Sequence, residues 1–148
     1  MTLEAPVVPP ADPVPPPEPS RVLDIVIKSA GVAIAVLAAI CSALLELFLT
    51  PLRLGGVPVG AAIVAAVVGN VAISWFAVTT VGRVWALGPP WVIWTLIMFF
   101  AAGVRTAEGD YLLSADNWVA LVMILVGSLT FAAFTYRMIL KKPPVTKQ

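Results

Sequence analysis

Four long apolar stretches fill most of the chain after residue 28, and they constrain the fold more than any other feature. They cover residues 29–50, 57–81, 85–104 and 117–140. Roughly 20 mostly apolar helical residues are needed to cross a hydrocarbon core about 30 Å thick, and each stretch supplies close to that length. The sequence therefore predicts an all-α integral membrane protein with four transmembrane helices.

The third stretch is the weakest of the set, because Gly88, Pro89 and Pro90 interrupt its start. Proline removes a backbone donor and disfavours helix in the residue before it. In the first turn of a helix this matters little, since those amide groups have no intrahelical partner. We therefore expect the third span over residues 89–104, with a re-entrant hairpin as the alternative.

Basic residues indicate the orientation in the membrane, because lysine and arginine collect in short cytoplasmic segments. The connection between spans two and three carries Arg83, whereas the opposite side carries only Arg53 and Arg105. The segments before span one and after span four hold the remaining basic residues, which are Arg21, Lys28, Arg137, Lys141, Lys142 and Lys147. Both termini are therefore predicted to be cytoplasmic, with residues 141–148 forming a basic tail.

The N-terminal segment has a different composition from the rest of the chain. Its first 20 residues contain eight prolines and few large apolar side chains. Such a segment has little to bury and samples extended polyproline II conformations. We expect residues 1–28 to form a disordered cytoplasmic tail that acts as a spacer, or alternatively as a ligand for an aromatic-lined groove.

The residue inventory argues against several function classes. The chain has no histidine and a single cysteine, Cys41, so haem and zinc sites lack their usual ligands. No pairing of a nucleophile with a base is apparent, and we expect neither an enzyme nor any bound cofactor. The net charge of +1 offers no basic field for nucleic acid. The acidic residues Glu108 and Asp110 are too few to hold calcium.

Glu46 is the leading candidate for a functional residue, because ionisable groups inside spans are rare and usually face protein or water. At about 1.5 Å of rise per residue, it lies roughly 27 Å beyond Lys28, near the outer boundary. It is interpreted as an interfacial acid paired with Arg53 or Arg105. The alternative is a carboxylate that couples transport to protons or cations.

Asn70 falls near the middle of the second span, where bulk water is out of reach. It is interpreted as a clamp that hydrogen-bonds to a neighbouring helix, with a place on a polar pathway as the alternative. Small residues at spacings of three and four permit close helix packing in the first two spans. They are Gly31, Ala35, Ala38 and Ala39, and then Ala62, Ala65, Ala66 and Gly69. The bulky third span, with Trp91, Trp94, Met98, Phe99 and Phe100, is expected to face lipid or a partner protein.

Three short motifs carry a family resemblance: the loop LRLGGVPVG at 52–60, the pair Gly69–Asn70, and the turn TAEGD at 106–110. With them, residues 30–140 resemble a family of small four-helix actinobacterial membrane proteins of unknown function. The resemblance implies a four-span topology and a bacterial plasma membrane, and it implies no activity.

Together these features favour an accessory or scaffold subunit of a membrane complex. Its expected partners are the lipid bilayer and either a second copy of the chain or a larger membrane protein. The alternative is a small oligomeric transporter or channel with Glu46 as coupling carboxylate, Arg105 as its counter-charge and Asn70 on the path.

Overall fold

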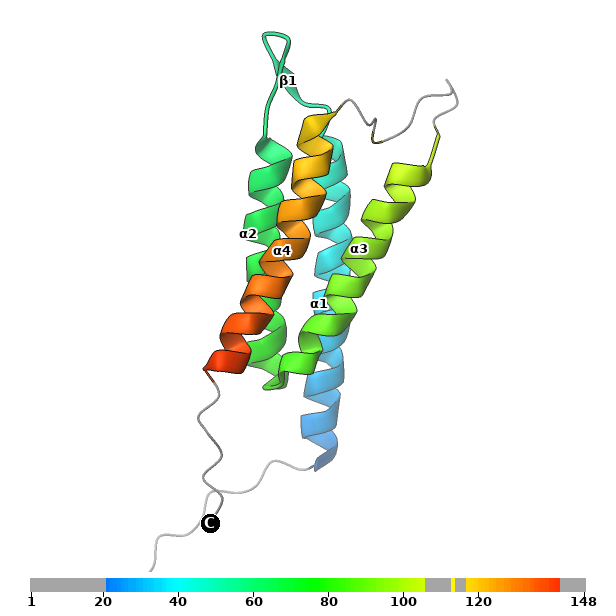
Figure 1. Ribbon diagram of the computed structural model, residues 1–148. Helices are drawn as coiled ribbons and strands as arrows, with labels where there is room; N and C mark the ends of the chain where they lie inside the picture. Colours follow the sequence, from blue (N-terminus) through cyan, green and yellow to red (C-terminus); the bar gives the residue numbers. More distant parts are fainter. Residues whose placement is uncertain (1–20, 106–112, 114–116, 142–148) are drawn as a thin grey trace, which may run out of the picture.

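The computed structural model describes residues 21–105, 113 and 117–141, and within them the chain is a bundle of helices with one short hairpin (Figure 1). The elements are α1 (Arg21–Leu49), β1 (Arg53–Leu54), β2 (Val57–Pro58), α2 (Ala61–Val81), the 3-10 helix η1 (Val84–Leu87), α3 (Gly88–Gly103) and α4 (Trp118–Leu140). The four α-helices, with η1 running into α3, are long and apolar enough to cross a membrane. This confirms the prediction of a helical, multi-pass membrane protein.

The helices are not packed evenly. α1 packs along α2, α2 packs on α4 and α1 packs on α3, whereas α3 and α4 share a much smaller contact. Figure 1 shows α3 inclined away from the rest of the bundle. The hairpin lies at one end, and the α2–α3 connection lies at the other with the start of α1 and the end of α4. We call these ends the hairpin end and the α2–α3 end.

Small residues form the contact between α1 and α2. Every fourth residue of α1 from Gly31 to Ala43 is buried, and Ala62 and Ala66 of α2 are also buried. A Cβ on Gly31 would lie 2.6 Å from Cγ2 of Thr80, so this position has no room for a side chain. The small-residue rows seen in the sequence therefore join two helices of one chain.

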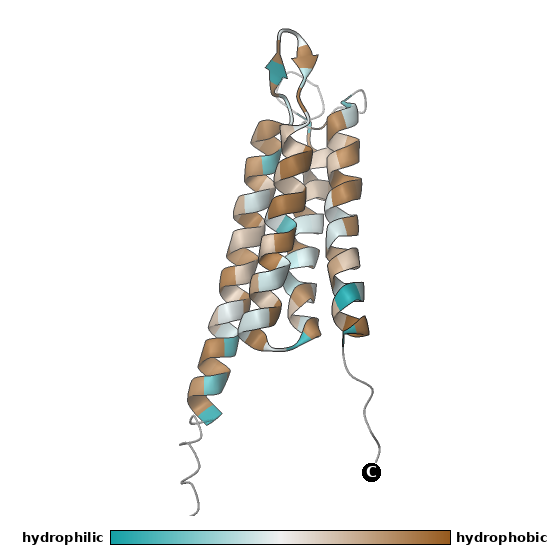
Figure 2. Cartoon of the chain, turned by 90° about the vertical axis from the view of Figure 1, so that its left-hand side faces the viewer, coloured by the Kyte–Doolittle hydropathy of each residue, from teal (hydrophilic) through white to brown (hydrophobic). Residues whose placement is uncertain are grey.

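The outer surface of the bundle is apolar along its length. Figure 2 shows hydrophobic residues along the helices and hydrophilic ones mainly toward their ends. Large side chains such as Leu37, Val64, Phe100 and Leu125 are more than half exposed. In water such a surface would be an aggregation hazard, whereas in a bilayer it is covered by lipid.

α1 begins earlier than predicted, at Arg21 instead of Ser29, so residues 21–28 are helical and not part of a disordered tail. An ion pair between Lys28 Nζ and Asp24 Oδ2, at 2.6 Å, joins successive turns of this segment. Asp24 also lies in the first turn, where a negative charge is favourable. The proline-rich residues 1–20, and the basic residues 142–148, lie outside the described residues.

The connection between α1 and α2 is a tight hairpin, which is why α2 begins at Ala61 and not at Val57. Arg53 pairs with Pro58, and Leu54 pairs with Val57. Gly55 and Gly56 have φ angles of 59° and 83°. A two-residue turn of this kind requires positive φ at both positions, which glycine adopts without strain.

The third span starts with η1 and continues directly into α3 at Gly88. Pro89 and Pro90 lie in the first turn, as predicted. α3 then runs without interruption to Gly103, so the segment is a continuous helix and not a re-entrant hairpin.

Candidate functional site

Glu46 is completely buried inside the bundle, with 0% of its surface exposed. Its Oε1 accepts a hydrogen bond from Ser42 Oγ at 2.7 Å, and its Oε2 accepts one from Trp94 Nε1 at 3.0 Å. Ser42 lies one turn earlier on α1, and Trp94 comes from α3. Both partners are neutral, so no positive charge compensates this carboxyl group among the residues that the structure describes.

The Glu46 carboxyl group lies deeper than its position in the chain suggests. Side chains on a helix lean toward its N-terminus, and that of Glu46 reaches back toward Ser42. Its Oε1 is 4.0 Å from the place of a Cβ on Gly69, which lies about 12 Å along α2 from Ala61. The sequence-based expectation of an acid at the outer boundary is therefore corrected to a carboxyl group well inside the spanning region.

Trp94 of α3 contacts both α1 and α4. It is 0% exposed, and its indole N–H is donated to Glu46. The ring packs against Phe131 of α4, with centroids 6.2 Å apart and planes tilted by 57°. The prediction that the large residues of the third span face lipid or a partner is thus wrong for Trp94 and Met98, which are buried, while Phe99 and Phe100 are exposed.

Asn70 joins α2 to α4. Its Nδ2 donates a hydrogen bond of 3.3 Å to the backbone carbonyl of Gly127, which agrees with its interpretation as a helix clamp. Its Oδ1 is buried and has no hydrogen-bond partner among the described residues, and the same is true of the Ser74 hydroxyl one turn further along α2. The core of the bundle thus retains unused polar groups next to the clamp.

Two glycines make room for these side chains. A Cβ on Gly127 would lie 2.5 Å from Cη2 of Trp94 and 3.1 Å from Nδ2 of Asn70. A Cβ on Gly69 would lie 2.5 Å from Oγ of Ser42. Ser42, Glu46, Asn70, Trp94 and Gly127 are therefore parts of one packed unit, which we call the core polar cluster.

Three members of the core polar cluster were not identified from the sequence: Ser42, Trp94 and Gly127. Ser42 could have been identified from the sequence, because it lies four residues before Glu46 and therefore on the same face of the helix. Trp94 and Gly127 are far from Glu46 in the chain, and only the packing of α3 and α4 brings them near it.

The two arginines proposed as partners of Glu46 lie elsewhere. Arg53 is exposed on β1 of the hairpin, and Arg105 is exposed just after α3 with an interaction of its own. Neither contributes a hydrogen bond or ion pair to Glu46 among the described residues, so the predicted ion pair is replaced by Ser42 and Trp94. The loop acids Glu108, Asp110 and Asp116 lie outside the described residues.

The geometry of the core polar cluster suits a carboxyl group that gains and loses a proton. Indole N–H is only a donor, so Oε2 must accept in either state. A serine hydroxyl both donates and accepts, so a proton on Oε1 is accommodated by reversing the hydrogen bond with Ser42. An uncompensated carboxylate in a low-dielectric core is costly, and uptake of a proton or a cation removes that cost.

Asn70→Ala tests the clamp between α2 and α4. We expect it to lower the free energy of unfolding by about 1 kcal/mol, the scale of interhelical hydrogen bonds in membranes. The measurement is unfolding by sodium dodecyl sulfate in mixed micelles, followed by circular dichroism. Asn117→Ala is the matched control, because Asn117 makes only a 3.5 Å hydrogen bond to the Thr50 carbonyl at the end of the bundle. Equal effects of the two substitutions would contradict the clamp.

No group of three or more His, Cys, Asp or Glu side chains that suits a metal ion occurs in residues 21–105, 113 and 117–141. Comparisons with models of known protein families, with curated proteins and with solved structures find no match, and the resemblance to the actinobacterial family stays a prediction.

Proposed function

We propose that this chain is a small membrane transporter that works as an oligomer and uses Glu46 as its coupling carboxylate. The observation that carries the proposal is the burial of this carboxyl group among neutral partners inside a spanning bundle. Intramembrane ionisable residues usually mark ion or proton pathways. No enzymatic role is proposed.

The unused polar groups of α2 support the same reading. Asn70 and Ser74 are separated by one helical turn and are both fully buried. Their oxygens, which have no hydrogen-bond partners among the described residues, lie on α2, and they follow one another from the level of Glu46 toward the α2–α3 end. A purely structural clamp needs only the amide nitrogen of Asn70, which donates to Gly127. A path for protons needs a series of hydrogen-bond acceptors. Arg105 has no part in this path, since it lies outside the core polar cluster.

An oligomer is proposed because one copy has too few helices to enclose a polar channel of its own. α3 packs mainly on α1 and leaves most of its surface available. Leu96, Phe99 and Phe100 form an exposed apolar face on it. A second copy placed there would enclose the space next to α3.

The proposed location is a bacterial plasma membrane, with both termini in the cytoplasm. The distribution of described basic residues supports this orientation, since lysine and arginine favour cytoplasmic segments. Arg21, Lys28, Arg83, Arg137 and Lys141 are at the α2–α3 end, against Arg53 and Arg105 at the other.

The test is proton movement in proteoliposomes that contain purified protein and a pH-sensitive dye. When a pH gradient is imposed, we expect the native protein to dissipate it and Glu46→Gln to reduce the rate to that of protein-free liposomes. Glutamine keeps the size of the side chain and cannot ionise, so assembly is expected to survive. Asp24→Asn is the matched control, since Asp24 is partly exposed and paired with Lys28 at the end of α1.

Equal rates for the native protein and Glu46→Gln would contradict a coupling role. The same preparation reports a second signal, the infrared absorption of the protonated carboxyl group. Its amplitude should change with pH in the native protein, and the difference between the native and Glu46→Gln spectra should contain a pH-dependent band from Glu46. A difference spectrum that is constant over the accessible pH range would reduce Glu46 to a structural group.

The second candidate is an accessory or scaffold subunit of a larger membrane complex. The exposed aromatic face of α3 favours it as well, because a partner protein would bury Phe99 and Phe100 as effectively as a second copy would. Purification of the tagged protein in mild detergent separates the candidates. A reproducible complex with other proteins favours the subunit, and a particle containing only this chain favours the transporter.

A further inference from the structure

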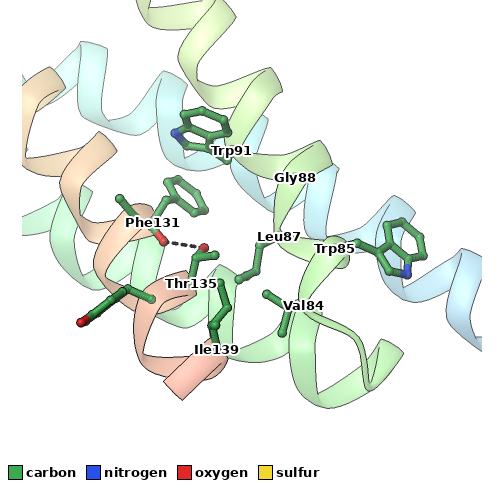
Figure 3. Close-up of a pocket in the computed structure, with 10 residues that line it drawn as sticks. Val84, Trp85, Leu87, Gly88, Trp91, Phe131, Thr135 and Ile139 are labelled. Carbon is green, nitrogen blue, oxygen red and sulfur yellow. Dashed lines mark hydrogen bonds between the residues drawn. The ribbon is translucent and has the colours of Figure 1, made fainter. Parts of the chain in front are cut away.

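A hollow lies between α3 and α4 at the α2–α3 end of the bundle (Figure 3). Its volume is about 550 Å³, and its wall is formed by apolar side chains from η1, α3 and α4, including Val84, Leu87, Trp91, Phe131 and Ile139. The one hydroxyl drawn near its centre, on Thr135, is already used, because it donates to the Phe131 carbonyl at 2.8 Å. We call this hollow the α3–α4 groove.

A second hollow adjoins the first and is basic. Its volume is about 730 Å³, and it shares Val84 and Trp85 with the α3–α4 groove. Arg83, from the α2–α3 connection, and Lys141, from the end of α4, both line it. A further hollow beside it, of about 320 Å³, is lined by Arg137 and again by Lys141.

Positive charge prevails at this end among the residues that the structure describes. Asp24 is the one described acid there, and it is paired with Lys28 at 2.6 Å. Arg83, Arg137 and Lys141 therefore form a basic cluster next to an apolar groove. An occupant that complements both parts must carry an anion at one end and an apolar chain at the other.

We propose that this site binds one anionic phospholipid, with an acyl chain in the α3–α4 groove and the phosphate between Arg83 and Lys141. The groove runs along spanning helices, so hydrocarbon chains reach it directly from the bilayer. Basic pockets between transmembrane helices bind acidic head groups. The indole of Trp85, exposed where the two hollows meet, has the location that tryptophan favours at the level of head groups.

The lipid site does not require transport by Glu46, since neither Glu46 nor Trp94 lines the α3–α4 groove. Phe131 forms part of the groove wall and also contacts Trp94. A chain in the groove would therefore support the ring that donates to Glu46, and the lipid would stabilise the packing of α3 against α4.

The test is native mass spectrometry of the full-length protein in detergent, titrated with phosphatidylglycerol or with phosphatidylcholine of the same chains. We expect phosphatidylglycerol to form a one-to-one adduct at lower concentration. Arg83→Gln combined with Lys141→Gln should weaken this adduct about tenfold. Arg53→Gln, at the hairpin end, is the charge control and should leave it unchanged. Equal binding of the two lipids, or full retention by the double variant, would overturn the proposal.

The apolar half of the site is tested separately with Ala132→Trp, which fills the groove without changing charge. Ala132 lines the groove, and its neighbour Ala133, also exposed, does not. Ala132→Trp should weaken the phosphatidylglycerol adduct, and Ala133→Trp should not. Competition with glycerophosphoglycerol, which has the head group without chains, should fail. Successful competition would show a site for free anions and would overturn the assignment to a lipid.

Discussion

Gly127→Leu is expected to lower the free energy of unfolding by about 3 kcal/mol, at the upper end of typical overpacking. The Cβ alone would lie 2.5 Å and 2.6 Å from two ring carbons of Trp94. The indole must then move, and this disturbs both its hydrogen bond to Glu46 and its packing on Phe131. Unfolding by sodium dodecyl sulfate in mixed micelles measures the effect.

Gly103→Leu is the matched control for this substitution, because nothing lies within 4 Å of a Cβ at the end of α3. It should change stability by only a few tenths of a kcal/mol, as is usual for surface sites. If Gly127→Leu were as well tolerated as Gly103→Leu, the close approach of α4 to Trp94 would be disproved. The double variant with Gly127→Leu and Trp94→Ala should lose less stability than the sum of the two single losses, since the ring that clashes with the introduced side chain is then absent.

Trp94→Ala should destabilise the protein by roughly 3 kcal/mol through the cavity left by a fully buried ring. Moving the ring between the core and lipid contributes little to this free energy, because lipid chains are as apolar as the core. Trp94→Phe distinguishes the contribution of ring packing from that of the indole N–H. It keeps most of the volume but removes the N–H donor, so Oε2 of Glu46 loses its partner, at a cost of about 1–3 kcal/mol.

Trp91→Ala provides the control on the same helix, since Trp91 is 43% exposed and should matter much less. The combination Trp94→Phe with Glu46→Gln tests whether the two side chains act together. A coupling energy near zero in this double-mutant cycle would mean that the hydrogen bond between them contributes nothing. We expect a coupling of at least about 0.5 kcal/mol, the lower end for residues in direct contact.

The sequence alone predicted the spans well, because length and hydropathy are local properties. The start of the third helix at the Gly88–Pro90 segment also follows from local spacing. The small-residue rows predicted close helix packing, but they did not show whether the neighbour was another span of this chain or a second copy. The start of α1 was missed, since residues 21–28 form a segment of mixed polarity, in which Asp24 and Lys28 are paired within the helix. The start of α2 was missed because Val57 and Pro58 belong to the hairpin.

For the candidate site, the sequence identified Glu46 and Asn70 but not the depth of the Glu46 carboxyl group or its partners. Counting residues places its Cα near the end of α1, but the direction of the side chain moves its carboxyl group inward by about a turn. Its partner Trp94 is 48 positions away, and no local pattern distinguishes it from the exposed Trp91. Trp94 reaches Glu46 because α3 packs on α1, which is a tertiary property.

The uneven packing of the helices has a mechanical consequence. Small residues join α2 to α1, and the Asn70 hydrogen bond joins α2 to α4. α3 packs mainly on α1, meets α4 in a smaller contact that includes the Trp94–Phe131 pair, and supplies the donor to Glu46. A change in the angle of α3 would move the indole of Trp94 relative to Glu46, so the hydrogen bond between them links the position of this helix to a single carboxyl group.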